Sequence, residues 1–374
     1  MSYKKLLEQL HDIEGAVKER YNPHLNVLET QSPSVNYTFG KGWGLPQGAS
    51  LLLWGAPKGG KSLICYSMIA QLHKNDPEAI AIRFDCEMKE RFQFGSEEEL
   101  HSFGIDPERY IVFEKNGPQI FNDITNKIND LCARGLKVKM VIIDPISGVM
   151  GRKMSESEEV EQVLIGDDAR TIQDGLKRVL EVQRKHRFSL ILTAQERANM
   201  DDNVRWGGPK TKAAVSFAVK HHCEYWMHVA RIEGKSGKTS WAGEALEDKS
   251  VKGFNDNAGE LTGHRIRVTM TDASFGAPKN RKGEFTIDYK RGVVGTHEEL
   301  FVLGTGYGII ERPNNQMYVY QGKQWRGQPA MLSALKQDPE LCESVLQDLK
   351  KKDLEGKLNE VAAPPEAPSE DTEE

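Results

Sequence analysis

Long apolar runs are absent from this chain of 374 residues. A membrane-spanning helix needs roughly 18 or more consecutive apolar residues, so we expect no membrane span. Cysteine is scarce too. The five cysteines lie far apart and form no CxxC pair. That spacing argues against a metal site or a disulfide framework and favours free thiols in a reducing compartment. The amino terminus lacks the apolar core of a secretory signal, and we therefore expect a cytoplasmic protein.

An excess of positive charge is also missing. The formal net charge is −5, so the overall charge does not indicate a nucleic-acid partner. Any nucleic-acid-binding surface must be local. With 28% charged and 38% hydrophobic residues, the composition is that of an ordinary globular protein. The length suggests one large domain with appendages, or two domains.

Short apolar segments alternate with amphipathic ones through the middle of the chain. This alternation predicts a mostly parallel β-sheet with helices on both faces. Three later apolar segments have no helical segments between them and are expected to extend the sheet in antiparallel fashion. The expected strands are 50–55, 79–85, 110–115, 139–144, 188–195, 222–232, 264–274 and 283–289, and the expected helices between the earlier strands are 61–74, 97–104, 120–135 and 167–186.

A phosphate-binding loop follows the first of these strands. Residues 55–62 read GAPKGGKS and fit G-x-x-x-x-G-K-[ST], between a strand and a helix as the motif requires. Its glycines let backbone N–H groups approach phosphates, while Lys61 would reach the terminal phosphates and Ser62 would ligate Mg²⁺. The alternative is a chance glycine-rich turn, which the flanking strand and helix disfavour. The predicted nucleotide-binding residues are Gly55, Ala56, Pro57, Lys58, Gly59, Gly60, Lys61, Ser62 and Leu63.

Two acids at strand ends are candidates for the chemistry. Asp144 ends an apolar strand and is predicted to hold the magnesium ion with Ser62, although such an acid can also cap the following turn. Glu87 follows another strand and could deprotonate a water molecule for attack on the γ-phosphate. An exposed loop acid is an equally good interpretation of the position of Glu87.

The order of these segments resembles that of the RecA-type recombinases of bacteria and phages, including the phage UvsX branch. LPQGASLLLWGAPKGGKS, IRFDCE, MVIIDPISGV and SLILTAQE follow one another as in that family, and the likeness runs from about residue 40 to 350. The resemblance implies ATP and Mg²⁺ as cofactors. It also implies Lys61 and Glu87 as catalytic residues, with Glu87 activating water, and Gln195 as the sensor of the γ-phosphate.

In this family two loops hold single-stranded DNA, and here they would span about residues 151–166 and 196–214. By position from Gln195, Arg197 matches a DNA-contacting arginine and Met200 a residue that separates base triplets. Four glutamates in the first loop are unfavourable beside phosphates, and a mixed-charge loop like the second is by itself usually a solvated surface. The resemblance favours DNA contact with little sequence preference. The candidates are Arg152, Lys153, Arg197, Met200, Arg205, Trp206, Gly207, Gly208, Lys210 and Lys212.

One feature of the family is missing. Its members commonly place basic residues where they reach the ATP of the neighbouring protomer, and the matching positions near Met270 and Asp272 are not basic. Lys279, Arg281 and Lys282 could substitute, or Asp272 could hold a monovalent cation in place of a lysine.

The sequence therefore predicts an α/β fold, with a RecA-like P-loop NTPase core, an N-terminal helix and a small C-terminal α/β lobe. We expect an N-terminal helix and linker over 1–40, the core over 41–290, the lobe over 291–352 and an acidic disordered tail over 353–374.

The predicted function is DNA-dependent ATP hydrolysis in helical filaments on single-stranded DNA, with homologous pairing and strand exchange. The implied partners are single-stranded DNA, homologous duplex DNA and further copies of the chain, with single-strand-binding and mediator proteins as additional candidates. A recombination mediator or regulatory paralogue that binds ATP and turns it over slowly is the alternative. A hexameric helicase ranks last, because no arginine-finger placement or accessory domain is recognisable.

Overall fold

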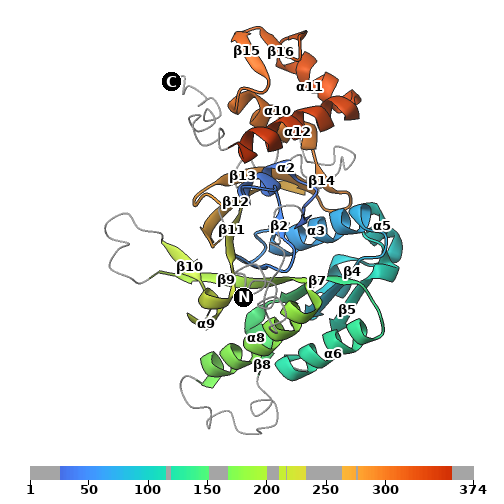
Figure 1. The fold of residues 1–374 in the computed structure, drawn as a ribbon, viewed down its shortest axis with the longest axis vertical. Coiled ribbons are helices and arrows are strands. Elements are labelled where there is room, and N and C mark those ends of the chain that lie inside the picture. Colours follow the sequence, from blue (N-terminus) through green and yellow to red (C-terminus); the bar gives the residue numbers. More distant parts are fainter. Residues whose placement is uncertain are drawn as a thin grey trace, which may run out of the picture.

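The computed structural model describes residues 26–114, 119–150, 167–199, 210–215, 217–232, 263–274 and 277–355. The predicted N-terminal helix, the first predicted DNA loop and most of the second lie outside these residues. Figure 1 shows an α/β core built on one large sheet, with the C-terminal elements stacked beyond one edge of that sheet. None of the described helices is long and apolar enough to cross a membrane.

Ten strands of the described chain form the large sheet. Its central strands contain apolar runs, such as LLLW in β3, and such runs suit strands that are buried on both faces. From β11 to β5 neighbouring strands are parallel, whereas β12, β13 and β14 continue the sheet in antiparallel fashion. In spatial order the strands are β14 (Gly292–Val294), β13 (Lys282–Asp288), β12 (Gly263–Ala273), β11 (Tyr225–Arg231), β3 (Ser50–Gly55), β9 (Ser189–Ala198), β7 (Val138–Asp144), β4 (Ile80–Asp85) and β5 (Tyr110–Glu114), with β10 (Thr211–Ala213) paired to β9.

The expected antiparallel extension is confirmed for β12 and β13 but is wrong for β11. This strand runs parallel to β3, with Tyr225 beside Leu51 and His228 beside Trp54. A helix, α9 (Phe217–His222), precedes β11 and belongs to the connection from β9. It has only six residues. So short a helix leaves no periodic pattern in the sequence, and the connection therefore looked like one without a helix.

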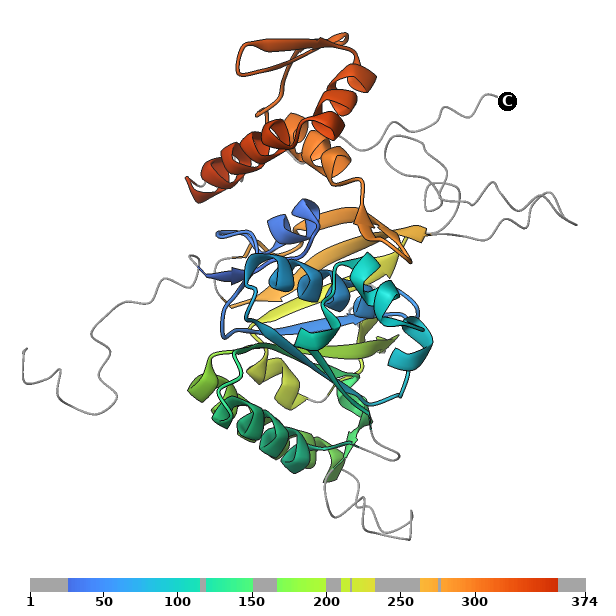
Figure 2. The same ribbon diagram turned by 90° about the vertical axis from the view of Figure 1, so that its right-hand side faces the viewer.

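Helices cover both faces of the parallel part of the sheet (Figures 1 and 2). Because side chains alternate along a strand, Ala81 of β4 packs in the core with Tyr66 of α3, while Ile82 packs in the opposite core with Ile124 of α6. The helices on the first face are α3 (Lys61–Asn75) and α5 (Glu97–Phe103), and those on the second are α6 (Phe121–Ala133) and α8 (Asp167–His186).

The close approach of α8 to α6 requires a glycine. A Cβ atom on Gly175 of α8 would lie 2.2 Å from Cγ of the buried Phe121. Alanine normally stabilises a helix relative to glycine by about 1 kcal/mol, but overpacking costs about 1–3 kcal/mol. The ring atoms nearest the backbone cannot move aside cheaply, so we expect Gly175→Ala to lower the free energy of unfolding by about 1–2 kcal/mol. Chemical denaturation measures this, with the exposed Gln173→Ala as the control that should change little.

Residues 26–40, which we expected to belong to the linker after the N-terminal helix, pack against the core together with the residues that follow them. The helix α2 (Pro33–Thr38) is buried throughout. Val35 joins the core beneath α3, and Trp43 joins the core of the C-terminal lobe. The sequence did not predict this burial, because the segment has few apolar residues among many polar ones.

A separate apolar core holds the C-terminal lobe together, and it includes the buried residues Phe301, Met331 and Val345. The lobe contains α10 (Thr296–Gly306), a sheet of β15 (Glu311–Asn314), β16 (Met317–Tyr320) and β17 (Lys323–Arg326), and helices α11 (Gln328–Gln337) and α12 (Pro339–Leu354). The remaining described elements are β1 (Val27–Leu28), β2 (Leu45–Pro46), α4 (Glu90–Gln93), η1 (Pro107–Arg109), β6 (Gln119–Ile120), η2 (Ile146–Gly148) and β8 (Val149–Met150).

Candidate functional site

The loop between β3 and α3 is held close to the sheet by its glycines. Gly55 has φ +154°, and a Cβ there would lie 2.1 Å from the carbonyl oxygen of Val229. Gly60, the residue just before α3, has φ +102°, and a Cβ there would lie 2.4 Å from Cδ1 of Ile266. Side chains are therefore excluded at both positions. The free N–H groups of the first turn of α3 make this loop suited to an anion.

Side chains of the loop point in different directions. Pro57 and Lys58 are exposed at its tip, whereas the side chain of Leu63 is buried in the apolar core. Of the nine predicted nucleotide-binding residues, Leu63 can therefore offer a ligand only its backbone. Lys61 folds back onto the loop, where its Nζ donates to the carbonyl oxygens of Gly55 (2.9 Å) and Ala56 (2.8 Å).

Carboxylates surround the ammonium group of Lys61. Burial lowers the pKa of Lys61 below its ordinary value, while the charges of Asp144, Glu196 and Glu87 act in the opposite direction. Asp144 ends β7 and Glu87 follows β4, and these two strands are far apart in the sequence. The fold thus brings the two predicted acids to the carboxyl end of the parallel sheet, beside the phosphate loop.

Asp144 accepts hydrogen bonds from three elements at the end of β7. Ser62 Oγ donates to its Oδ2 over 2.9 Å, and Arg83 Nη2 donates to the same oxygen over 2.6 Å. Thr193 Oγ1 of β9 donates to Oδ1. Because its hydrogen is donated to Asp144, the Ser62 hydroxyl has its oxygen lone pairs left to accept a hydrogen bond or to bind a cation.

The donor set around Ser62 fits magnesium. A hydroxyl oxygen and a carboxylate oxygen are hard ligands, and Mg²⁺ commonly binds through one or two protein groups together with phosphates. Within the described residues, no cluster of three or more His, Cys, Asp or Glu side chains could itself hold a metal ion. The described groups would therefore hold the ion together with the phosphates of a nucleotide.

Glu87 lies on the loop after β4 and is partly accessible. Its side chain is 34% exposed and forms an ion pair with Lys89. Its backbone N–H donates to Oδ1 of the buried Asp85 over 3.1 Å. Glu87 is thus a half-exposed carboxylate on an anchored backbone. It is close enough to Lys61 for its charge to raise the pKa of that lysine.

Gln195 stands where β9 passes the phosphate loop. It is the residue opposite Gly55 in the parallel pairing of β3 with β9, and its side chain is exposed. Beyond Gln195, β9 continues and pairs with β10, which places Arg197 directly opposite Lys212. The base of the second predicted DNA loop is therefore a two-stranded ribbon with two basic residues side by side.

Only part of the predicted DNA surface lies in the described chain. Arg197 and Lys210 are exposed, and Lys212 is half-buried. The N–H of Asn199 donates to the carbonyl oxygen of Lys210 over 2.9 Å, so the ribbon continues toward the loop tip. The candidates Arg152, Lys153, Met200, Arg205, Trp206, Gly207 and Gly208 lie outside the described residues.

The structure corrects one of the predicted substitutes for the missing basic residues. Arg281 is buried and pairs with Asp353 over 3.1 Å, so it links the core to the C-terminal lobe and cannot reach a neighbouring protomer. Lys279 pairs over 2.9 Å with Asp272, and this ammonium group holds the pKa of Asp272 below its usual value. Lys282 is exposed on β13.

Three residues of the site were not predicted from the sequence. Arg83 and Thr193 both bind Asp144. Glu196 lies 3.2 Å from His228 and close to Lys61. A signal existed for Arg83, because a charge inside the apolar run IAIRFD must find a buried partner. No comparable signal marks Thr193 or Glu196.

Comparisons with known proteins point to one family. Residues 14–258 match the family model described as the RecA N-terminal domain. A RecA protein of Oleidesulfovibrio alaskensis is 23% identical over 344 residues, which cover 92% of this chain and 88% of the relative. A RecA protein of Thermus thermophilus is 23% identical over 322 residues, or 86% of this chain and 84% of the relative.

A solved structure titled as that of the RadB recombinase aligns with 71% of this chain and 98% of its own, with a TM-score of 0.46 and 16% identity. The match to the family model covers well over half of the sequence. The chain therefore belongs to the RecA family.

Proposed function

We propose that this protein is a DNA-dependent ATPase that forms helical filaments on single-stranded DNA and catalyses homologous pairing and strand exchange. ATP and Mg²⁺ are its proposed cofactors. Its proposed partners are single-stranded DNA, homologous duplex DNA and further copies of the chain. Single-strand-binding and mediator proteins are additional candidate partners.

One observation carries the proposal: a single strand joins the two candidate sites. Gln195 of β9 lies opposite Gly55, where the phosphate loop begins. Two residues further along β9, Arg197 lies opposite Lys212 of the basic ribbon. A change at the phosphate end of β9 would therefore reach the ribbon through two residues of continuous strand. This supports coupling between nucleotide and DNA.

The proposed mechanism assigns a separate task to each side chain. Lys61 would leave the loop carbonyls to bind the terminal phosphates, and Ser62 and Asp144 would hold the magnesium ion. The ion would neutralise the charge that develops on the phosphates. Glu87 would accept a proton from the attacking water, and Gln195 would respond to the γ-phosphate. Arg197 and Lys212 would neutralise DNA phosphates.

The proposal is tested by steady-state ATP hydrolysis with and without single-stranded DNA. We expect strong stimulation by DNA in the natural protein and loss of that stimulation in Arg197→Ala/Lys212→Ala. Each lost phosphate contact should also reduce the slope of log K against log salt by about 0.7 for single strands. The double variant should therefore bind DNA more weakly and with a slope about 1.4 smaller.

The control removes two basic residues elsewhere on the surface. Arg134 and Lys177 are exposed on or beside α6 and α8, with side chains 75% and 51% exposed. Arg134→Ala/Lys177→Ala should keep full stimulation and the natural salt slope. Equal losses in both double variants would point to a general charge effect and would count against a DNA site at the ribbon.

A mediator with slow ATP turnover is the second candidate. The burial of Arg281 favours it, because one of the few basic residues available for the neighbouring nucleotide site is used inside its own chain. Tight nucleotide binding with negligible hydrolysis, whether or not DNA is present, would favour this candidate over the recombinase.

A further inference from the structure

A buried arginine lies between Asp144 of the candidate site and a second acid, Glu90. Arg83 lies on β4 within the apolar core beneath α3, and only 2% of its surface is exposed. Its Nη2 donates to Asp144 over 2.6 Å, and its Nε lies 3.4 Å from Oε2 of Glu90. The ring of Tyr66 lies against the guanidinium, with its centroid 5.0 Å away. A charge in such a place is costly unless geometry and partners compensate for it.

The second acid of this network is itself fully engaged. Glu90 is buried and accepts hydrogen bonds from Tyr66 over 2.6 Å and from Tyr110 over 2.7 Å. These hydroxyls come from α3, which covers this face of the sheet, and from β5, the strand beside β4. Glu90 therefore has a fixed position, and Arg83 is held between two fixed carboxylates.

The network also reaches the loop that bears Glu87. The buried Asp85 accepts the N–H of Glu87 over 3.1 Å and the N–H of Glu90 over 2.7 Å. The N–H of Cys86 donates to the backbone oxygen of Asp144 over 2.9 Å. One set of buried bonds thus fixes both the Asp144 carboxylate and the backbone at Glu87.

We propose that Arg83 is a positioning residue that fixes the Asp144 carboxylate against Ser62 and, through Glu90, ties it to the loop that carries Glu87. The inference rests on the proposed function, because it concerns the magnesium and nucleotide site of that reaction. The guanidinium suits this task because its planar fork hydrogen-bonds Asp144 through Nη2 while its Nε side forms an ion pair with Glu90. Without it, Asp144 loses one of its three hydrogen bonds, and the bond to Ser62 loses its fixed geometry.

Removing Arg83 alone would change both the position of the Asp144 carboxylate and the net charge around it, and the two effects could not be separated. Arg83, Asp144 and Glu90 together carry one net negative charge. In Arg83→Met/Glu90→Gln only Asp144 of the three remains charged, so the net charge is unchanged. Glu90 is not left ionised without its partner, whereas Asp144 loses its ion pair of 2.6 Å, so the fold of the variant is verified by circular dichroism first. Loss of the positive charge beside Asp144 would by itself favour Mg²⁺ binding, so a higher Mg²⁺ requirement in this variant reports the position of Asp144.

The test is a titration of a fluorescent ATP analogue at increasing Mg²⁺, and again in EDTA. We expect the double variant to bind the analogue without metal as the natural protein does, but to need about 10–100-fold more Mg²⁺ for half-maximal metal-dependent binding. A folded double variant with the natural Mg²⁺ requirement would overturn the inference. Natural protein that binds magnesium and nucleotide but never hydrolyses ATP would instead count against the proposed function and leave this test valid.

Two further variants keep the test decisive. Arg83→Lys keeps the charge, but its ammonium cannot hold two carboxylates in the fixed directions of the fork, so its Mg²⁺ requirement should also rise. A natural requirement in Arg83→Lys would equally contradict the inference. Arg109→Met is the matched control, because Arg109 also bonds a carboxylate, Asp106, but at the other end of the sheet. It should leave the Mg²⁺ requirement unchanged.

Discussion

Glu87→Gln is expected to lower steady-state ATP hydrolysis by about 10²–10⁴-fold, the range that a general base contributes. The amide has the size of the carboxylate but cannot accept a proton from water. The backbone of Glu87 is anchored by Asp85 and does not depend on the side chain. Binding of a fluorescent ATP analogue should therefore be nearly unchanged, so that the rate falls without a loss of affinity.

The matched control is Glu108→Gln, which makes the same chemical change on an exposed carboxylate. Glu108 lies in η1, just before β5, at the amino end of the parallel strands and so far from the phosphate loop. It should hydrolyse ATP at the natural rate. Full activity in Glu87→Gln would show that Glu87 is only a half-exposed loop acid, paired with Lys89, which was the alternative interpretation of its position.

The sequence was sufficient for the parallel part of the fold because of its periodicity. β4, β7 and β9 are short apolar runs separated by amphipathic helices, and this pattern has few other solutions. Two features of the fold were not predicted from this pattern, for the same physical reason. The direction of β11 depends on the six-residue helix α9, and the burial of α2 depends on isolated apolar residues. Neither is long enough to produce a period, and only tertiary packing determines them.

The candidate site divides in a similar way. Ser62 and Asp144 were predicted as partners from motif and strand order, and they lie within hydrogen-bonding distance. Arg83 and Thr193 bind the same carboxylate but belong to no sequence motif. Their role depends on which strands are neighbours in the sheet. The order β9, β7, β4 places both next to Asp144, and this order is not encoded in any local pattern.

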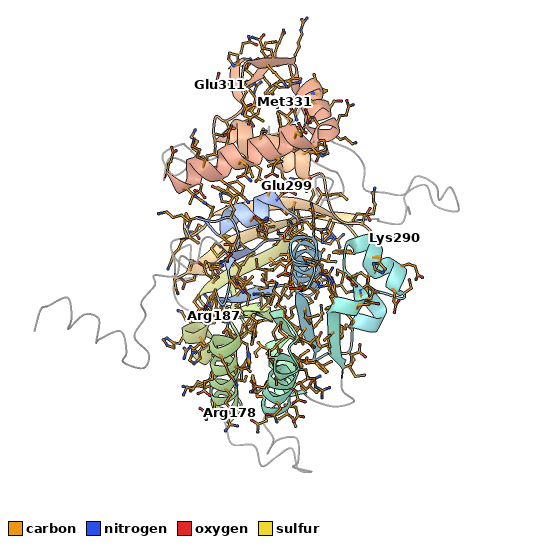
Figure 3. The ribbon with its side chains drawn as sticks, turned by 45° about the vertical axis from the view of Figure 1, so that its right-hand side comes forward. Arg178, Arg187, Lys290, Glu299, Glu311 and Met331 are labelled. Carbon is orange, nitrogen blue, oxygen red and sulfur yellow. The ribbon has the colours of Figure 1, made fainter. Side chains whose placement is uncertain are left out.

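A buried acid where the C-terminal lobe meets the core leads to the second prediction (Figure 3). Glu299 of α10 is only 1% exposed. Its Oε2 accepts hydrogen bonds from Ser32 Oγ over 2.6 Å and from the N–H of Ser34 over 2.9 Å. Burial raises its pKa to about 8, with a smaller contribution from the charge of Glu298, although the bonds to Ser32 and Ser34 act against this rise.

The raised pKa makes the protein less stable at high pH. Because the folded pKa of about 8 exceeds the ordinary 4.5, Glu299 contributes its full stability below pH 4.5 and loses it as pH rises through 8. Between these values the loss is about 1.4 kcal/mol per pH unit, or about 3 kcal/mol by pH 7.

Glu299→Gln should remove this pH dependence, because the amide stays neutral while its oxygen can still accept from Ser32 and Ser34. Urea denaturation at pH 5, 6, 7 and 8 measures it. We expect the natural protein to lose stability relative to the variant by about 1.4 kcal/mol for each unit of pH. The exposed Glu311→Gln makes the same change of charge in the C-terminal lobe and should follow the natural curve. Parallel curves for Glu299→Gln and the natural protein would mean that Glu299 stays charged. The hydrogen bonds from Ser32 and Ser34 would then lower its pKa more than burial raises it.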